Sequence, residues 1–256
     1  MTNNGKIFLI CNNDIFSKHV NMCLKEDSLE IDIGQNLPED EPEIVIINLF
    51  FLSEGIEKQL YRVLKSKVKK IILIENGLDL YLNSKNTIPF SVYTKLIPKN
   101  DICERLLDLE NKIIESRKQY AIFRVSEIYG ISTRNEIIER LLFGTINELE
   151  NSVRDFIYDG DVISAIEIAL RKEVSGVFDI ASGKSIELKK LVELIKKLSK
   201  NNLDINWKRK KITIEFNCDN FKYYKWQPIV ELEIGLKTLL AFRRNNGSLH
   251  CTRKII

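Results

Sequence analysis

Short apolar runs alternate with amphipathic stretches along this chain, and this alternation is the strongest constraint on its fold. A continuous apolar run of this length, bounded by turn residues, is typical of a parallel strand that is covered on both faces. The runs are KIFLIC (6–11), LEIDI (29–33), EIVIINLF (43–50), KKIILIE (69–75), YAIFRVSEIYG (120–130) and GVFDI (176–180). Apolar residues at helical spacing between them predict helices over 15–24, 56–64, 102–113, 162–170 and 188–198. The pattern predicts an α/β fold with a doubly wound parallel sheet.

Bulk properties narrow the classes of protein. The formal net charge of +3 gives no sign of a polyanion partner, so we expect no nucleic acid partner. We see neither a signal peptide nor a run of membrane-spanning length, and therefore expect a cytoplasmic protein without a membrane partner. The five cysteines form no Cys-x-x-Cys pair, which favours reduced thiols and no metal site. They are Cys11, Cys23, Cys103, Cys218 and Cys251.

Three segments in the second half of the chain resemble one family. FRVSEIYG (123–130) is similar to Arg-Leu-x-Asn-Val-Tyr-Gly of the extended short-chain dehydrogenase/reductase family, the NAD-dependent epimerases and dehydratases of nucleotide sugars. The segment 153–195, which begins VRDFIYDGDV, is similar to that family's Arg-Asp-Phe-x-Tyr-Val-x-Asp-Val and its later Gly-x-x-Phe-Asn-Ile-Gly-x-Gly. KWQPIVELEIGLKTLLAF (225–242) is similar to its Gly-Trp-x-Pro segment and last helix.

The resemblance implies an overall architecture. It implies a single Rossmann-like domain over residues 1–256, in which residues from about 181–256 contribute most of a small C-terminal substrate lobe. It also implies a nucleotide-sugar ligand and, in active members, NAD(P). Members of the family commonly dimerise through two helices, which correspond here to those around 53–67 and 102–117.

The glycine-rich turn of the family has no counterpart in this sequence. Its three glycine positions fall on Cys11, Asp14 and Ser17. A carboxylate at the middle position would face the pyrophosphate of a dinucleotide, and two like charges about 4 Å apart at an effective dielectric of about 20 cost roughly 4 kcal/mol. Asn12 and Asn13 can supply left-handed turn geometry, but they leave the carboxylate in place. We therefore expect no residue to bind a dinucleotide here, and no cofactor.

The catalytic tyrosine and lysine of the family are also replaced. Counting back from Arg124 through the preceding helix places the family's glutamate on Glu110, its lysine on Leu106 and its tyrosine on Ile102. Pro98, four residues before Ile102, matches a proline of the family and supports this register. Neither aliphatic side chain has a proton to exchange, so we expect Ile102 and Leu106 to pack in the core.

The family's serine position is also replaced, and a local match to its tyrosine motif does not restore the catalytic residues. Glu75 and Asn76 stand where the family has Ser-Ser. YLNSK (81–85) has the spacing Tyr-x-x-Ser-Lys, but it starts six residues after Glu75, and Pro89 and Pro98 would break a long helix begun there. Tyr81 better matches the tyrosine of the family's Val-Tyr-Gly turn, so we interpret the motif as a chance match.

One residue of the substrate half is retained. Arg154 matches the family arginine that contacts the nucleotide-sugar diphosphate or its nucleoside, so the resemblance implies a substrate-binding role. The alternative is an arginine that is paired with a neighbouring acid such as Asp155. Glu127 replaces the asparagine of the Arg-Leu-x-Asn motif and Ile131 replaces a proline, and a shortened segment after Gly130 favours a truncated pocket.

Two hypotheses follow. The first is a catalytically inactive binding or regulatory module in nucleotide-sugar or surface-glycan biosynthesis, forming a homodimer or a heterodimer with an active relative. The alternative is an active NAD(P)-dependent nucleotide-sugar reductase or epimerase whose acid or base is atypical, with Glu75, Tyr81 or Tyr93 as candidates.

Overall fold

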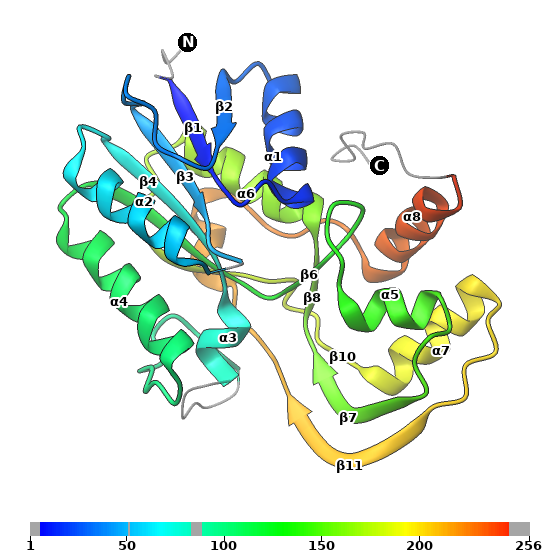
Figure 1. Ribbon diagram of the computed structural model, residues 1–256. Helices are drawn as coiled ribbons and strands as arrows, with labels where there is room; N and C mark the ends of the chain where they lie inside the picture. Colours follow the sequence, from blue (N-terminus) through cyan, green and yellow to red (C-terminus); the bar gives the residue numbers. More distant parts are fainter. Residues whose placement is uncertain (1–5, 51, 83–88, 246–256) are drawn as a thin grey trace.

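A six-stranded parallel sheet forms the centre of the molecule (Figure 1). The computed structural model describes residues 6–50, 52–82 and 89–245. The strands lie in the order β2-β1-β3-β4-β5-β9, and each neighbouring pair is parallel. They are β1 (Ile7–Ile10), β2 (Ile31–Gly34), β3 (Ile44–Asn48), β4 (Lys70–Asn76), β5 (Gln119–Val125) and β9 (Gly176–Ile180). Each arises from one of the predicted apolar runs, and the predicted fold class is confirmed.

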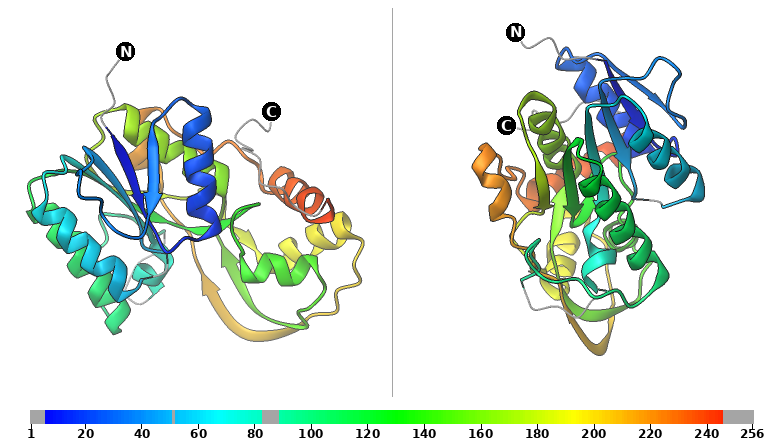
Figure 2. Two further views of the ribbon diagram at one scale, coloured as in Figure 1. Left: turned by 45° about the horizontal axis from the view of Figure 1, so that its top comes forward. Right: turned by 90° about the vertical axis from the view of Figure 1, so that its left-hand side faces the viewer.

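Helices cover both faces of this sheet (Figures 1 and 2). One face packs against α1 (Ile15–Glu26) and α6 (Asp159–Arg171), and the other against α2 (Glu54–Lys65) and α4 (Asp101–Glu115). Alternate residues of β1 point to opposite layers, which explains why the strands are apolar throughout rather than on one face.

The chain reverses direction across the sheet between β1 and β3. From β1 it runs through α1 to β2, then returns past β1 to β3 and continues outward through α2 to β4. Within the described residues the sheet ends at β2 on this side, so its first half has two strands. Ligands of open α/β sheets bind at such a reversal point, beyond the carboxyl ends of the strands.

A second lobe packs beside the carboxyl ends of the central strands. Its three-stranded sheet has the order β10-β7-β11, and its helices share one apolar core. These elements are β7 (Glu148–Arg154), β10 (Ile186–Glu187), β11 (Asn206–Thr213), α5 (Glu136–Leu142), α7 (Leu188–Ser199) and α8 (Leu232–Arg244). The lobe therefore includes residues 136–154 as well as later ones. The paired strands β6 (Glu127–Tyr129) and β8 (Phe156–Tyr158) connect the lobes, and two short helical segments, α3 (Gly77–Leu82) and η1 (Asp219–Tyr224), complete the fold.

The expectation that Ile102 packs in the core is wrong. Asn100 caps α4, since its side chain accepts a hydrogen bond from the backbone N–H of Cys103, so Ile102 is the second residue of the helix. The buried stripe starts at Cys103 and continues through Leu106, whereas Ile102 is 49% exposed. Leu106 is in the core as predicted.

Two further features concern membrane-spanning helices and the cysteines. Across the described ranges we find no helix that combines the length and the apolar character needed to cross a bilayer. Cys11, Cys23, Cys103 and Cys218 are buried thiols, and Cys251 lies outside the described residues.

The second lobe provides a sharp test of packing at Gly235 in α8. A Cβ atom at Gly235 would lie 2.2 Å from the hydroxyl oxygen of Tyr129. We predict that Gly235→Ala lowers the free energy of unfolding by about 1–3 kcal/mol because the tyrosine must move. Tyr129→Phe in the same chain should recover part of this loss, as measured by urea denaturation.

Gly55, in α2, offers the matched control. A Cβ atom there meets nothing closer than the Ser53 hydroxyl oxygen at 3.8 Å. Gly55→Ala should therefore stabilise the protein by up to about 1 kcal/mol through helix propensity. Equal effects of the two alanines would contradict the described packing of α8.

Candidate functional site

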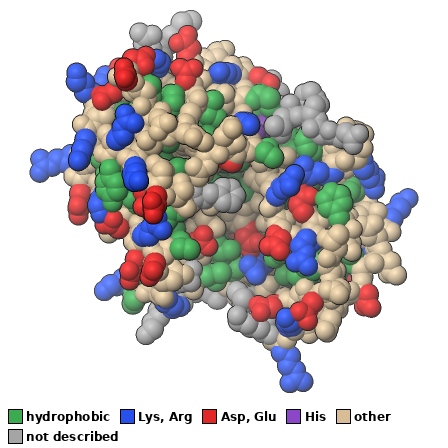
Figure 3. Space-filling model, viewed as in Figure 1, with side chains coloured by type: hydrophobic (Ala, Val, Ile, Leu, Met, Phe, Trp, Pro, Cys, Tyr) green, Lys and Arg blue, Asp and Glu red, His purple; other side chains and the backbone are tan. Residues whose placement is uncertain are grey.

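A cavity of about 680 Å³ lies at the reversal point of the sheet, between the two lobes. The surface is hollowed there, and acidic side chains gather around the hollow (Figure 3). The lining comes from the turn after β1, from the ends of β3 and β4, and from residues 126–136. It comprises Asp14, Ile15, Phe16, Asn48, Phe50, Asn76, Leu78, Ser126, Glu127, Ile128, Ser132, Thr133, Arg134, Asn135 and Glu136. The position agrees with the general rule for ligand sites in this class of sheet.

Asp14 occupies the N-cap of α1 at the floor of this cavity. Its carboxylate accepts hydrogen bonds from the backbone N–H and the hydroxyl of Ser17, both at 2.8 Å, and from Nδ2 of Asn48 at 3.3 Å. Asn13 adopts a left-handed φ of 61°, as predicted, so the turn forms without glycine. The carboxylate thus uses a backbone donor of the helix N-terminus and adds a negative charge there. These residues do not fit a dinucleotide pyrophosphate.

The other two glycine positions face away from solvent. Cys11 is 1% exposed and Ser17 is 0% exposed. The hydroxyl of Ser17 accepts a hydrogen bond from Asn48 at 2.9 Å, so Ser17, Asn48 and Asp14 form one closed network at the start of the helix.

Glu75 and Asn76, at the family's serine positions, point in different directions. The side chain of Glu75 is fully buried, and burial, with Glu110 as the second cause, raises its pKa well above the usual range. Asn76 lines the cavity, where its amide donates to Asp79 at 3.0 Å and accepts from the backbone N–H of Leu78 at 3.1 Å. Asn76 therefore holds the start of α3, and Glu75 does not reach the cavity.

Glu75 belongs to a buried polar cluster behind the cavity. Glu110 and Arg124 form a two-pronged ion pair at 2.7 and 2.6 Å. Arg124 also donates to the hydroxyl of Tyr81 at 3.3 Å, and that hydroxyl donates to Asp179 at 2.6 Å. Burial raises the pKa of Asp179 to about 7, and burial followed by Asp179 raises the pKa of Tyr81 above its usual range. This network joins α4, β5, α3 and β9.

The tyrosine of the YLNSK motif lies in the core. Tyr81 is 1% exposed and stacks on Phe90 with ring centroids 5.0 Å apart. Lys85, the lysine of that motif, lies outside the described residues. Tyr93, the other candidate tyrosine, is 86% exposed and is not among the lining residues of the cavity.

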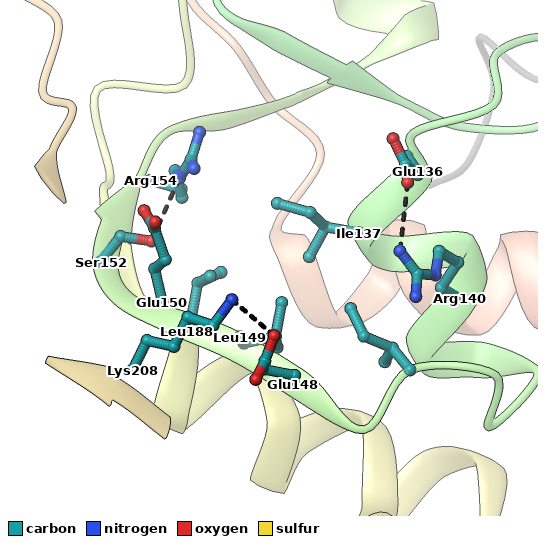
Figure 4. A pocket seen from close by; sticks show the side chains of 11 residues that line it. Glu136, Ile137, Arg140, Glu148, Leu149, Glu150, Ser152, Arg154, Leu188 and Lys208 are labelled. Atoms are coloured by element: carbon teal, nitrogen blue, oxygen red, sulfur yellow. Dashed lines mark hydrogen bonds and ion pairs between the residues drawn. The ribbon is translucent and has the colours of Figure 1, made fainter. Parts of the chain in front are cut away.

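Arg154 lines a smaller cavity of about 250 Å³ in the second lobe (Figure 4). Its Nη1 pairs with Oε1 of Glu127 at 2.9 Å, and its Nε donates to Ser152 at 3.2 Å. Asp155 is not its partner, because Asp155 accepts hydrogen bonds from Ser182 and Gly183. The acid beside Arg154 is therefore a different one from the Asp155 suggested by the sequence.

The smaller cavity contains further charges that the sequence analysis did not single out. Arg140 pairs with Glu136 at 3.2 Å, and Lys208 pairs with Glu148 at 2.5 Å (Figure 4). The alternation of Glu148, Glu150, Ser152 and Arg154 along β7 was the available signal, since alternate residues of a strand share a face.

A buried aspartate fixes the rim of the large cavity. Asp159 accepts hydrogen bonds from the backbone N–H of Ser132 at 2.8 Å and from its hydroxyl at 2.6 Å. The neighbouring Ile131, which replaces the proline of the family, is buried. Among the described residues no group of three or more histidine, cysteine or acidic side chains could hold a metal ion.

Comparisons with known proteins agree with this architecture. No family model matches the sequence. UDP-glucose 4-epimerase of Thermotoga maritima, solved with UDP-glucose, has a TM-score of 0.77 at 20% identity, over 94% of this chain and 99% of that one. UDP-N-acetylglucosamine 4-epimerase of Methanobrevibacter ruminantium has a TM-score of 0.80 at 13% identity, over 95% of this chain and 99% of that one. The protein has the extended short-chain dehydrogenase/reductase fold.

These structures confirm the fold that the sequence resemblance implied. Another structure with it, UDP-glucose 4-epimerase of Thermus thermophilus in complex with NAD, has a TM-score of 0.76 at 14% identity, over 93% of this chain and 99% of that one. The dTDP-4-dehydro-6-deoxyglucose reductase of Escherichia coli is 29% identical over 185 residues, which are 65% of this chain. The match spans about half of that reductase, 55% of its length. The chain therefore shares its fold with these epimerases and is similar in sequence to this reductase.

The Asp14 cap should contribute measurably to stability. We predict that Asp14→Ala lowers the free energy of unfolding by about 1 kcal/mol, because the N–H of Ser17 loses its acceptor. Asp14→Asn should retain most of the stability, since asparagine also caps helices well. Urea denaturation measures both, and an alanine variant as stable as the wild type would contradict the cap.

Glu75 should impose a pH dependence on folding. Its raised pKa means that the folded protein retains a proton that the unfolded chain releases near pH 4.5, so stability falls as the pH rises above that value. The loss is at most about 1.4 kcal/mol per pH unit until the folded pKa is reached. We predict that Glu75→Gln, which is neutral at every pH, flattens the stability curve from pH 5 to 8 and is more stable than the wild type at pH 8.

Glu115→Gln is the matched control for this measurement, because Glu115 is exposed at the end of α4. It should leave the slope of the stability curve unchanged. If Glu75→Gln also leaves the slope unchanged, Glu75 is not held in its neutral form by the folded protein.

Proposed function

We propose that this protein is a catalytically inactive nucleotide-sugar-binding or regulatory module that acts in nucleotide-sugar or surface-glycan biosynthesis. The observation that carries the proposal is the Asp14 carboxylate, which caps α1 at a glycine position of the family that the sequence resembles. A conventional NAD(P) cofactor would have to bring its pyrophosphate against that carboxylate. The proposed protein therefore works without the cofactor on which the chemistry of its relatives depends.

The catalytic positions support the same proposal. Ile102 and Leu106 replace the tyrosine and lysine, and neither can exchange a proton with a sugar. The atypical groups that an active enzyme would need are poorly placed. Glu75 and Tyr81 are buried behind the cavity, and Tyr93 is 86% exposed away from its lining.

Arg154 supports a nucleotide-sugar ligand. The Arg154 guanidinium group lines the smaller cavity beside Glu127 of the larger one, and such a group can bind a diphosphate with two parallel hydrogen bonds. In that arrangement the smaller cavity would take the nucleoside end of the ligand and the larger cavity the sugar. The larger cavity offers the half-buried amide of Asn76 to a sugar hydroxyl group.

A protein partner completes the proposal. The helices α2 and α4 lie side by side on the outer face of the sheet, joined by an ion pair between Glu57 and Arg105 at 2.6 Å. Tyr61 and Ile114 are partly exposed on them, at 38% and 40%. We propose that these helices pair with a second copy of the chain or with an active relative.

Calorimetric titration of UDP-glucose and dTDP-glucose tests the function. We predict binding of at least one of them without NAD(P), and no turnover when NAD(P)H is added. Arg154→Ala should weaken that binding by about tenfold or more, because one charge-assisted hydrogen-bond pair is lost.

The control variant is Arg244→Ala, since Arg244 is exposed at the end of α8. It removes the same charge and should leave the affinity unchanged. Oxidation of NADH coupled to conversion of either nucleotide sugar would refute the inactive module, and equal affinities of the Arg154 and Arg244 variants would refute the assigned site.

A further inference from the structure

The ion pair between Glu127 and Arg154 lies on the boundary between the two cavities. Arg154 lines the smaller cavity and Glu127 lines the larger one. Their side chains are only 15% and 11% exposed, and the two charged atoms are 2.9 Å apart. Any anion that binds Arg154 therefore arrives beside a carboxylate that is already there.

The surroundings make the charge of Glu127 depend on Arg154. Burial raises the pKa of Glu127, and Asp155 adds to the increase. Arg154 and the amide of Asn135 act in the opposite direction, but the net direction is upward. A carboxylate whose pKa is already raised while it is paired would be harder still to keep charged if its guanidinium partner were neutralised.

The other charged groups on the large cavity are differently engaged. Asp14 is held by Ser17 and Asn48, and Glu136 pairs with Arg140 on the same helix. The remaining cation of the lining, Arg134, has an exposed side chain. Among the described lining residues, Glu127 is thus the carboxylate that Arg154 neutralises.

We propose that Glu127 is a specificity-determining residue that competes internally for Arg154, so that a phosphate-bearing ligand binds only together with one proton that Glu127 takes from solvent. This inference rests on the proposed function, because it concerns the same ligand at the same site. It adds a selectivity that a neutral side chain at position 127 would not provide.

The physical reason is the repulsion between two anions that share one guanidinium group. Arginine has five N–H donors, so Arg154 can approach a phosphate without fully leaving Glu127. The carboxylate and the phosphate would then be like charges in a largely buried space, where Coulomb interactions are screened much less than in water. Protonation removes the repulsion and turns the carboxyl group into a hydrogen-bond donor to a phosphate oxygen.

The sign of the pH dependence follows. Below the pKa of Glu127 the proton is already bound, and a diphosphate binds at full affinity. Above that pKa, each pH unit should weaken binding by up to tenfold, because one proton must be taken up with the ligand. The protein would therefore bind its nucleotide sugar more tightly at mildly acidic pH.

Calorimetric titration of UDP-glucose from pH 5.5 to 8.5 tests the proposal. Both phosphates of this probe are esterified and keep their charges over that range, so the phosphate groups that Arg154 would bind do not titrate. We expect the wild-type dissociation constant to rise by up to tenfold per pH unit at the alkaline end. Repeating the titration in buffers of different ionisation enthalpy should show the uptake of about one proton there.

Glu127→Gln should remove the effect. This variant keeps the shape of the side chain but cannot compete as an anion, so it should bind UDP-glucose at least about tenfold more tightly than the wild type at pH 8.5 and with little dependence on pH. Glu136→Gln is the matched control, since it removes a carboxylate from the lining of both cavities without touching the pair. It should retain the pH slope.

The outcomes separate the two proposals. If the wild type binds UDP-glucose equally well at every pH, and Glu127→Gln binds it no more tightly, this inference is overturned and the proposed function stands. Binding that is absent from both proteins even at pH 5.5 overturns both. If Glu127→Gln does not fold, the wild-type proton count at pH 8.5 decides alone, and a count of zero overturns the inference.

Discussion

On our account, the hydrogen-bonded Asp14 carboxylate at the start of α1 is the constraint that limits which ligands the crevice of this sheet can hold. Its hydrogen bonds satisfy a helix N–H from within the chain and link the turn after β1 to Asn48 at the end of β3. These are the two strands between which the chain reverses direction, and the ligand crevice of such a sheet lies there. A carboxylate at that point complements the helix dipole, and for the same reason opposes an anionic ligand.

Internal pairing of polar and charged side chains recurs around the two cavities. Behind the cavity, Arg124 is held by Glu110, and Tyr81 donates to Asp179. On the substrate side, Arg154 is held by Glu127. These pairs hold together the elements that lie beside and behind the cavities. On our account, of these three pairs only the one at Arg154 is open to exchange with a ligand, because both of its members border a cavity.

Much of the fold could be predicted from the sequence because it depends on burial. Each central strand is covered on both faces and so appears as an apolar run, as KIILIE in β4 does. The exposure of Ile102 could not be predicted from periodicity, since Ile102 lies four residues before Leu106 on the same stripe and is exposed as the second residue of α4, where the stripe ends.

The candidate site was harder to predict because it depends on pairs that are distant in sequence. Arg154 meets Glu127 because β6 and β8 pair in parallel, with Glu127 opposite Phe156. No local pattern indicates that register, so Asp155, the adjacent acid, was the natural but wrong partner. The Asp14 cap was different, because its position in the family's glycine pattern indicated a carboxylate at the helix start. The structure adds the donors that this carboxylate engages.

The most direct test of the account is the cofactor content of the purified protein. Heat denaturation followed by chromatography of the supernatant measures any NAD(P) carried through purification, and titration of NAD(P)H into the native protein measures binding to an empty site. The account predicts no released dinucleotide and no saturable binding at micromolar concentration. Stoichiometric release of NAD(P) would contradict it, since the dinucleotide would then bind despite the Asp14 carboxylate.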